Sequence, residues 1–126
     1  MTYILVADDD TIFRTIIKRH LEQLGFEVIE EESGKRVARQ IFSYRPAACV
    51  IDIFMEEKEG IETIHEITKM ADKPKIIAVS SNAMYLNAVL GLGADAVLKK
   101  PITLETLKLK LNQLGISPGV RLDSPT

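Results

Sequence analysis

Ala48-Cys49-Val50-Ile51-Asp52 is a short apolar run that ends at a carboxylate. Runs of this length that are rich in β-branched residues are typical of strands buried on both faces of a parallel sheet. Further runs of the same kind, one of them weaker, occur along the chain, so the sequence predicts five short strands. The other four lie at residues 4–7, 27–30, 76–79 and 96–98.

Segments with helical spacing follow the predicted strands. In the last of them, Leu104, Leu107 and Leu111 recur at three or four residues, as on one face of an amphipathic helix. Thr103 is suited to cap that helix at its start, and Gly115 is suited to end it. Comparable spacing predicts four more helices, at residues 12–24, 37–41, 61–68 and 85–92.

The alternation of strands and helices predicts the fold. Right-handed crossovers between parallel strands place helices on both faces of one sheet. We therefore predict an α/β protein with a flavodoxin-like, doubly wound (βα)5 fold and a five-stranded parallel sheet. In this prediction residues 1–114 form the domain, and residues 115–126, with two prolines and two glycines, form a flexible tail or linker.

The helical spacing also predicts which side chains are buried. We expect the first helix to bury Ile12, Ile16, Ile17, His20, Leu21 and Leu24, and the fourth helix to bury Tyr85, Val89, Leu90 and Leu92.

The composition is ordinary for a globular chain of 126 residues, with 46% hydrophobic residues, 27% charged residues and a net charge of −2. The weak charge and the lack of a basic cluster argue against a nucleic-acid partner. No apolar stretch approaches the length of a membrane span, and no targeting signal is visible. The lone Cys49 is expected to be a buried core thiol. These features predict a cytoplasmic protein.

Polar side chains follow four of the predicted strands. They are Asp8-Asp9-Asp10, Asp52, Ser80-Ser81 and Lys99-Lys100-Pro101. Because the carboxyl ends of parallel strands meet at one edge of a sheet, we expect these side chains to share a pocket. Each motif alone has a structural explanation as a helix cap or a turn, but their coincidence at four strand ends favours a functional site.

The predicted pocket suits phosphoryl chemistry. Neighbouring carboxylates repel one another, and a cation is needed to hold them ionised. Either Lys99 or Lys100 can supply one positive charge, and a hard divalent ion with oxygen ligands can supply more. Mg²⁺, or Mn²⁺, fits best because such an ion binds a few carboxylates and also accepts phosphate oxygens. One carboxylate could then attack phosphorus while the cations neutralise the phosphoryl oxygens.

The ordered set of motifs resembles the receiver domain of two-component signalling, over residues 3–114. The resemblance covers nearly the whole chain, and the set is specific although each motif is short. The motifs are Ala7-Asp8-Asp9-Asp10 followed by Arg14, Leu24-Gly25-Phe26-Glu27-Val28, Asp52-Ile53-Phe54-Met55 with Gly60, Ala78-Val79-Ser80, Leu92-Gly93-Ala94-Asp95 and Lys100-Pro101.

The resemblance implies a role for each acidic residue. Asp52 would be the phosphoacceptor. Asp9, Asp52 and the backbone carbonyl of Phe54 would bind Mg²⁺ directly, and Asp8 would bind it through water.

The resemblance also implies the switch residues and the partners. Ser80 and Lys100 would contact the phosphoryl group, and Pro101 would follow a cis peptide bond. The donor would be a sensor histidine kinase or a phosphotransfer protein, and an unknown downstream protein would read the switched surface. On this view the chain is a signalling switch that catalyses only its own phosphorylation and dephosphorylation.

Several positions depart from the family pattern, among them Glu56, which stands where the family often has proline, Phe54 and Val97. Bulky Phe54 lies two residues after the acceptor, where we expect it to affect the access of water. Val97 stands where many members carry an aromatic residue that couples to the hydroxyl, so the output step is the least predictable. Among alternatives, a degenerate receiver that acts as a phosphorylation-independent scaffold stays open. A haloacid-dehalogenase-type phosphatase is disfavoured because Phe54 replaces the second aspartate of that chemistry.

Overall fold

The computed structural model describes residues 1–55 and 60–119. Five parallel strands form one sheet in the order β2-β1-β3-β4-β5. The strands are β1 (Tyr3–Ala7), β2 (Glu27–Glu31), β3 (Ala48–Asp52), β4 (Lys75–Ser80) and β5 (Ala96–Lys99).

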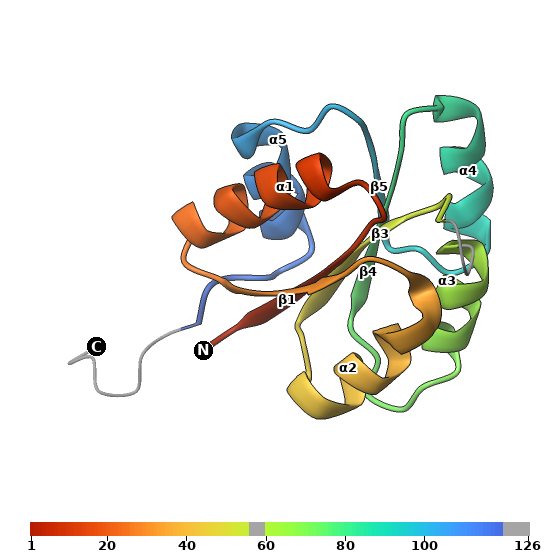
Figure 1. Cartoon of the computed structure of the whole chain (residues 1–126), viewed down its shortest axis with the longest axis horizontal. Coiled ribbons are helices and arrows are strands. Elements are labelled where there is room, and N and C mark those ends of the chain that lie inside the picture. The colour runs from red at the N-terminus through yellow and green to blue at the C-terminus, as the bar shows by residue number, and fades with distance from the viewer. Residues whose placement is uncertain (56–59, 120–126) are drawn as a thin grey trace.

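Helices cover both faces of this sheet (Figure 1). Helices α1 and α5 lie on one face, and α2, α3 and α4 lie on the other. The predicted doubly wound α/β fold is therefore confirmed. The helices are α1 (Thr11–Gln23), α2 (Val37–Tyr44), α3 (Gly60–Thr68), α4 (Ala83–Gly91) and α5 (Leu104–Gln113), and a short 3₁₀ helix, η1 (Gly34–Arg36), precedes α2.

The central strands β1 and β3 are apolar up to the end of β3 at Asp52 because both of their faces are buried, whereas the edge strand β2 carries three glutamates and is partly exposed. In β1, Ile4 and Val6 belong to the core under α1 and α5, whereas Leu5 and Ala7 belong to the core on the opposite face. Successive side chains of a strand point to opposite faces, so one continuous apolar run serves both cores.

The strand register decides where the carboxylates lie. Ala7 at the end of β1 pairs with Ile51 of β3, so Asp8 and Asp52, each one residue further on, leave the sheet side by side. The strand order reverses around β1 and β3, which is the switch point where ligands bind in open α/β sheets.

The predicted buried face of α1 is partly wrong. Phe13, Ile17 and Leu21 are buried, whereas Ile12 is 72% exposed and Ile16 is 44% exposed. The contact with the sheet follows the four-residue spacing from 13 to 21, and positions 12 and 16 lie about 100° further around the helix.

The predicted face of α4 needs a similar correction. Leu86 and Val89 are its buried residues, whereas Tyr85, Leu90 and Leu92 are more than 40% exposed. An apolar helix carries too many candidates for spacing alone to select the face that packs.

The expected ends of α5 are present. The Thr103 hydroxyl accepts a hydrogen bond from the Thr106 amide, and Gly115 adopts a φ of 77° just after the helix. Ile116 follows and is buried in the core. Residues 120–126 of the predicted tail lie outside the described residues, so the domain boundary at residue 114 stays a prediction.

Candidate functional site

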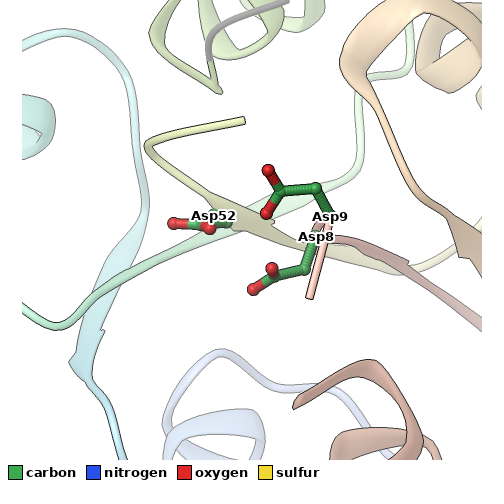
Figure 2. Close-up of side chains that lie close together, drawn as sticks. All are labelled: Asp8, Asp9 and Asp52. Carbon is green, nitrogen blue, oxygen red and sulfur yellow. The ribbon is translucent and has the colours of Figure 1, made fainter. Parts of the chain in front are cut away.

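Three carboxylates from the ends of two neighbouring strands converge (Figure 2). Asp8 and Asp9 follow β1, and Asp52 ends β3. One carboxylate oxygen from each of the three residues lies within 4.8 Å of the other two. Asp8 is fully buried, Asp52 is 7% exposed and Asp9 is exposed, so the group opens toward solvent on the side of Asp9.

The third consecutive acid, Asp10, has a structural role. Its Oδ1 accepts hydrogen bonds from the amides of Ile12 and Phe13 at 2.9 and 3.3 Å, which caps α1. Asp8 Oδ1 in turn accepts from the Asp10 amide at 2.9 Å. The turn between β1 and α1 therefore uses Asp10 to begin the helix and holds Asp8 in place.

Arg14, in the first turn of α1, binds the same β1–α1 turn. Its Nη1 donates to the backbone carbonyl oxygen of Asp8 at 2.7 Å, and its Nε donates to Glu30 at 3.4 Å. The sequence motif included Arg14, but sequence alone gave no reason for its presence. The structure gives a reason, because the Arg14 contact joins α1 to the backbone of Asp8.

Lys100 is the lysine that neutralises the group. Its Nζ lies 2.6 Å from Asp8 Oδ2 and 3.5 Å from Asp52 Oδ2, whereas the neighbouring Lys99 is exposed. The Lys100–Pro101 peptide bond is cis. The residue pattern left both lysines open and the family resemblance implied Lys100, which is the lysine that the structure places against the acids.

Ser80 ends β4, the strand next to β3. It is 2% exposed, and its hydroxyl oxygen accepts a hydrogen bond from the Asn82 amide at 3.1 Å. The Lys100 amide donates to the Ser80 carbonyl oxygen at 2.9 Å, so the ends of β4 and β5 are joined beside the acidic group.

Phe54 and Gly60 are both hydrogen-bonded to the end of β3. The Phe54 amide donates to Asp52 Oδ1 at 3.2 Å, and the Gly60 amide donates to the Ile53 carbonyl oxygen at 2.9 Å. A Cβ atom at Gly60 would lie 1.9 Å from the Asp52 backbone oxygen, so only glycine fits there. Phe54 is 45% exposed and meets Tyr85 edge to face, with 5.0 Å between ring centroids.

The environment raises the pKa of Asp52 to about 6. Burial is the main cause, and the nearby Asp8 carboxylate adds to it, while Lys100 and the Phe54 amide act in the opposite direction. The single ammonium therefore leaves Asp52 only partly compensated.

We expect Asp52→Asn to raise the free energy of unfolding of the metal-free protein near pH 7.5 by about 1–2 kcal/mol. The folded-state pKa of about 6 exceeds the ordinary value of 3.8, so ionised Asp52 destabilises the fold. This cost is full above pH 6, shrinks as the pH falls through that value, and vanishes below 3.8. Urea denaturation in EDTA at about pH 7.5 and about pH 4 measures it, and an equal gain at both pH values would contradict the assignment.

The donor set fits a hard divalent cation. Asp8, Asp9 and Asp52 offer only carboxylate oxygens, and their spacing allows them to share one ion. Soft or borderline metals prefer sulfur and imidazole ligands. The single cysteine, Cys49, is fully buried, and burial raises the pKa of its thiol, so it serves as a core residue.

Comparison with known proteins identifies the family. A family model described as the response regulator receiver domain matches residues 4–112. The chain belongs to this family. It is a receiver domain of a two-component response regulator, and such domains are signalling switches.

The receiver is similar to curated and solved relatives. It is 32% identical to the response regulator MprA of Mycobacterium sp. (strain KMS), over 97% of this chain and 55% of the relative. A receiver domain from Methanospirillum hungatei JF-1 superimposes with a TM-score of 0.82 at 29% identity and covers 90% of this chain and 93% of its own. A receiver domain from Bermanella marisrubri gives a TM-score of 0.83 at 28% identity and covers 91% of this chain and 99% of its own.

The receiver spans about half the length of the curated relatives it matches. Within residues 1–55 and 60–119, no helix is long and apolar enough to cross a membrane.

One residue of the site was missed by the sequence reasoning. The Lys100 ammonium lies over the ring of Phe13, 4.0 Å from the ring centroid. Phe13 lies four residues before Ile17, so the helical spacing could have placed it on the buried face of α1. It also lies only three residues after Asp10, so it could have been placed near the acidic residues.

Proposed function

We propose that this receiver takes a phosphoryl group onto Asp52 in a reaction that requires Mg²⁺ and that a sensor histidine kinase or a phosphotransfer protein supplies. The observation that carries the proposal is the convergence of Asp8, Asp9 and Asp52, with the Lys100 ammonium against Asp8 and Asp52. A carboxylate held in this way is a nucleophile with a cation site beside it.

The transfer forms one bond and breaks one bond. A carboxylate oxygen of Asp52 bonds to phosphorus, and the bond between phosphorus and the donor nitrogen breaks, so the electron pair returns to the imidazole of the donor. The product on Asp52 is a mixed anhydride. Lys100 and Ser80 lie at the ends of the neighbouring strands, where they can donate hydrogen bonds to the phosphoryl oxygens.

The residues that would hold Mg²⁺ are Asp9, Asp52 and the backbone carbonyl of Phe54, with Asp8 bound through water. A bound divalent ion supplies positive charge that neutralises the phosphoryl oxygens during transfer. Mn²⁺ has the same preference for oxygen ligands and could replace Mg²⁺.

The test is incubation with acetyl phosphate followed by intact mass. We expect the purified protein to gain the mass of one phosphoryl group with Mg²⁺ present and to gain nothing after EDTA treatment. Restoring Mg²⁺ in excess over EDTA is the control, and it should restore the modification. A protein that stays unmodified with acetyl phosphate and with phosphohistidine donors would favour the phosphorylation-independent scaffold instead.

Phosphorylation would switch a surface by changing the charge at the strand ends. It adds about −1.5 to −2 charges and new acceptor oxygens next to Ser80 and Lys100. Phe54, two residues after β3, contacts Tyr85 of α4, so a shift of Phe54 can bias the position of α4. Val97 on β5 lacks the aromatic ring of the usual coupling, and the Phe54–Tyr85 contact offers another route.

We expect Phe54→Asn to speed the loss of the phosphoryl group from Asp52 by about threefold or more. Phe54 is bulky and its amide binds Asp52, so its ring is placed to limit the approach of water to the anhydride. The decay of the phosphorylated protein, followed by intact mass after removal of the donor, measures the rate.

Phe42→Asn is the matched control for this change. Phe42 is also an exposed aromatic residue, but it lies near the end of α2, which leads toward the opposite end of the sheet. It should leave the decay rate unchanged. Equal decay rates in wild type and Phe54→Asn would show that Phe54 does not shield the anhydride.

A further inference from the structure

The Lys100 ammonium has an aromatic neighbour as well as two carboxylates. Its Nζ lies 2.6 Å from Asp8 Oδ2, 3.5 Å from Asp52 Oδ2 and 4.0 Å from the centroid of the Phe13 ring. The Lys100 side chain is only 16% exposed, and Phe13 is 8% exposed. The ammonium is thus enclosed between an acidic side and an aromatic side.

We propose that Phe13 is a positioning residue for Lys100, whose ring face holds the ammonium where it can reach a phosphoryl group on Asp52. This inference rests on the proposed function for its role in phosphorylation, although the contact itself does not. The ring carries negative charge density on its face and attracts a cation that lies over it.

A lysine side chain needs a contact that fixes the position of its ammonium. Its ammonium is a compact charge on a flexible four-carbon stem, so it has many conformations to lose when it binds a small group. Asp8 alone would draw the ammonium to itself, and Asp52 changes its charge when it is protonated or modified. The Phe13 ring attracts the cation whatever the state of Asp52, so it supplies a constant contact.

Phe13 is itself held rigidly. Its backbone amide donates to Asp10 Oδ1 at 3.3 Å in the first turn of α1. Its ring belongs to the core cluster that also contains Ile102 and Leu107, just after the cis bond and within α5. The Phe13 ring, which belongs to α1, therefore lines the site on the side of the core.

The structural explanation for Phe13 is that it only fills the core. Phe13→Leu separates the two roles, because leucine keeps an apolar side chain but has no ring face. Phe26→Leu is the matched control, since Phe26 is 5% exposed in the same core cluster but lies just before β2, at the opposite end of the sheet. Phe13→Tyr keeps the ring face and should rescue the function.

The first readout is the initial rate of phosphorylation by acetyl phosphate with Mg²⁺. We expect Phe13→Leu to lower this rate about three- to tenfold, and Phe26→Leu and Phe13→Tyr to leave it unchanged. In a Lys100→Met background, Phe13→Leu should have no further effect, because the ring acts through the ammonium. An equal fall in both backgrounds, or an equal fall in Phe26→Leu, would overturn the inference.

The second readout needs no phosphorylation. Protons next to the Lys100 ammonium lie over a ring face, so their NMR signals should be shifted upfield, and they can be assigned by their loss in Lys100→Met. Phe13→Leu should move them to the positions of exposed lysines, whereas Phe26→Leu should not. Signals that stay in place in Phe13→Leu overturn the inference, while a wild type that is never phosphorylated overturns the proposed function alone.

Discussion

The Asp52→Asn variant is expected to gain no phosphoryl group under conditions in which the wild type is fully modified. Asparagine keeps the size of the side chain, but it has no carboxylate oxygen to attack phosphorus and no anionic ligand for Mg²⁺. The loss should be complete within detection, because Asp8 lies against Lys100 and Asp9 is exposed to water. Intact mass after incubation with acetyl phosphate and Mg²⁺ measures it, and a peptide map locates the modified residue.

Asp10→Asn is the matched control for this experiment. It makes the same chemical change two residues after Asp8, at a position whose oxygen caps α1, and asparagine caps helices about as well as aspartate. The control should be phosphorylated like the wild type. Modification of Asp52→Asn at another residue would mean that a different carboxylate is the acceptor.

The sequence was sufficient for the fold because several signals agreed. Short apolar runs, the helical spacing between them and polar residues after four of the five runs all indicated the same alternating topology. The register then followed from the topology, since Ala7 pairs with Ile51 and brings Asp8 beside Asp52. The placement of the acids could therefore be predicted without any knowledge of their contacts.

The sequence was not sufficient for the contacts inside the site. The residue pattern alone could not choose between Lys99 and Lys100, because the path of the chain after β5 decides which lysine faces the acids, and only the family resemblance indicated Lys100. The predicted face of α1 chose Ile12 and Ile16 over Phe13, because isoleucines dominate the apolar residues of that helix. Which apolar residue packs is decided by the direction of the helix over the sheet, a tertiary property that spacing does not encode.

In these contacts the Lys100 ammonium lies against two of the three clustered carboxylates, those of Asp8 and Asp52. Lys100 then has two roles that can be separated. We expect it to stabilise the fold when no metal is present and, under the proposed function, to bind the phosphoryl group on Asp52. The first role should be shared with Mg²⁺, since either cation can neutralise the same acids.

Lys100→Met is therefore expected to lower the free energy of unfolding in EDTA by about 2–3 kcal/mol. Methionine keeps the length of the stem, but it leaves the fully buried Asp8 without the cation that lies 2.6 Å away in the wild type. Mg²⁺ should stabilise the variant more than the wild type, because it replaces the missing charge and binds only the folded state. Urea denaturation of both proteins, in EDTA and at millimolar Mg²⁺, measures the two differences.

Lys99→Met is the matched control, since Lys99 is the preceding lysine of the same strand end and is exposed. It should change the stability little in either buffer, because exposed charges contribute little. If the deficit of Lys100→Met stayed the same in Mg²⁺ as in EDTA, the lysine and the metal would not be neutralising the same carboxylates. If Mg²⁺ removed the loss of stability in Lys100→Met, the metal and the lysine would be neutralising the same acids at the ends of β1 and β3. The proposed transfer of a phosphoryl group to Asp52 requires this.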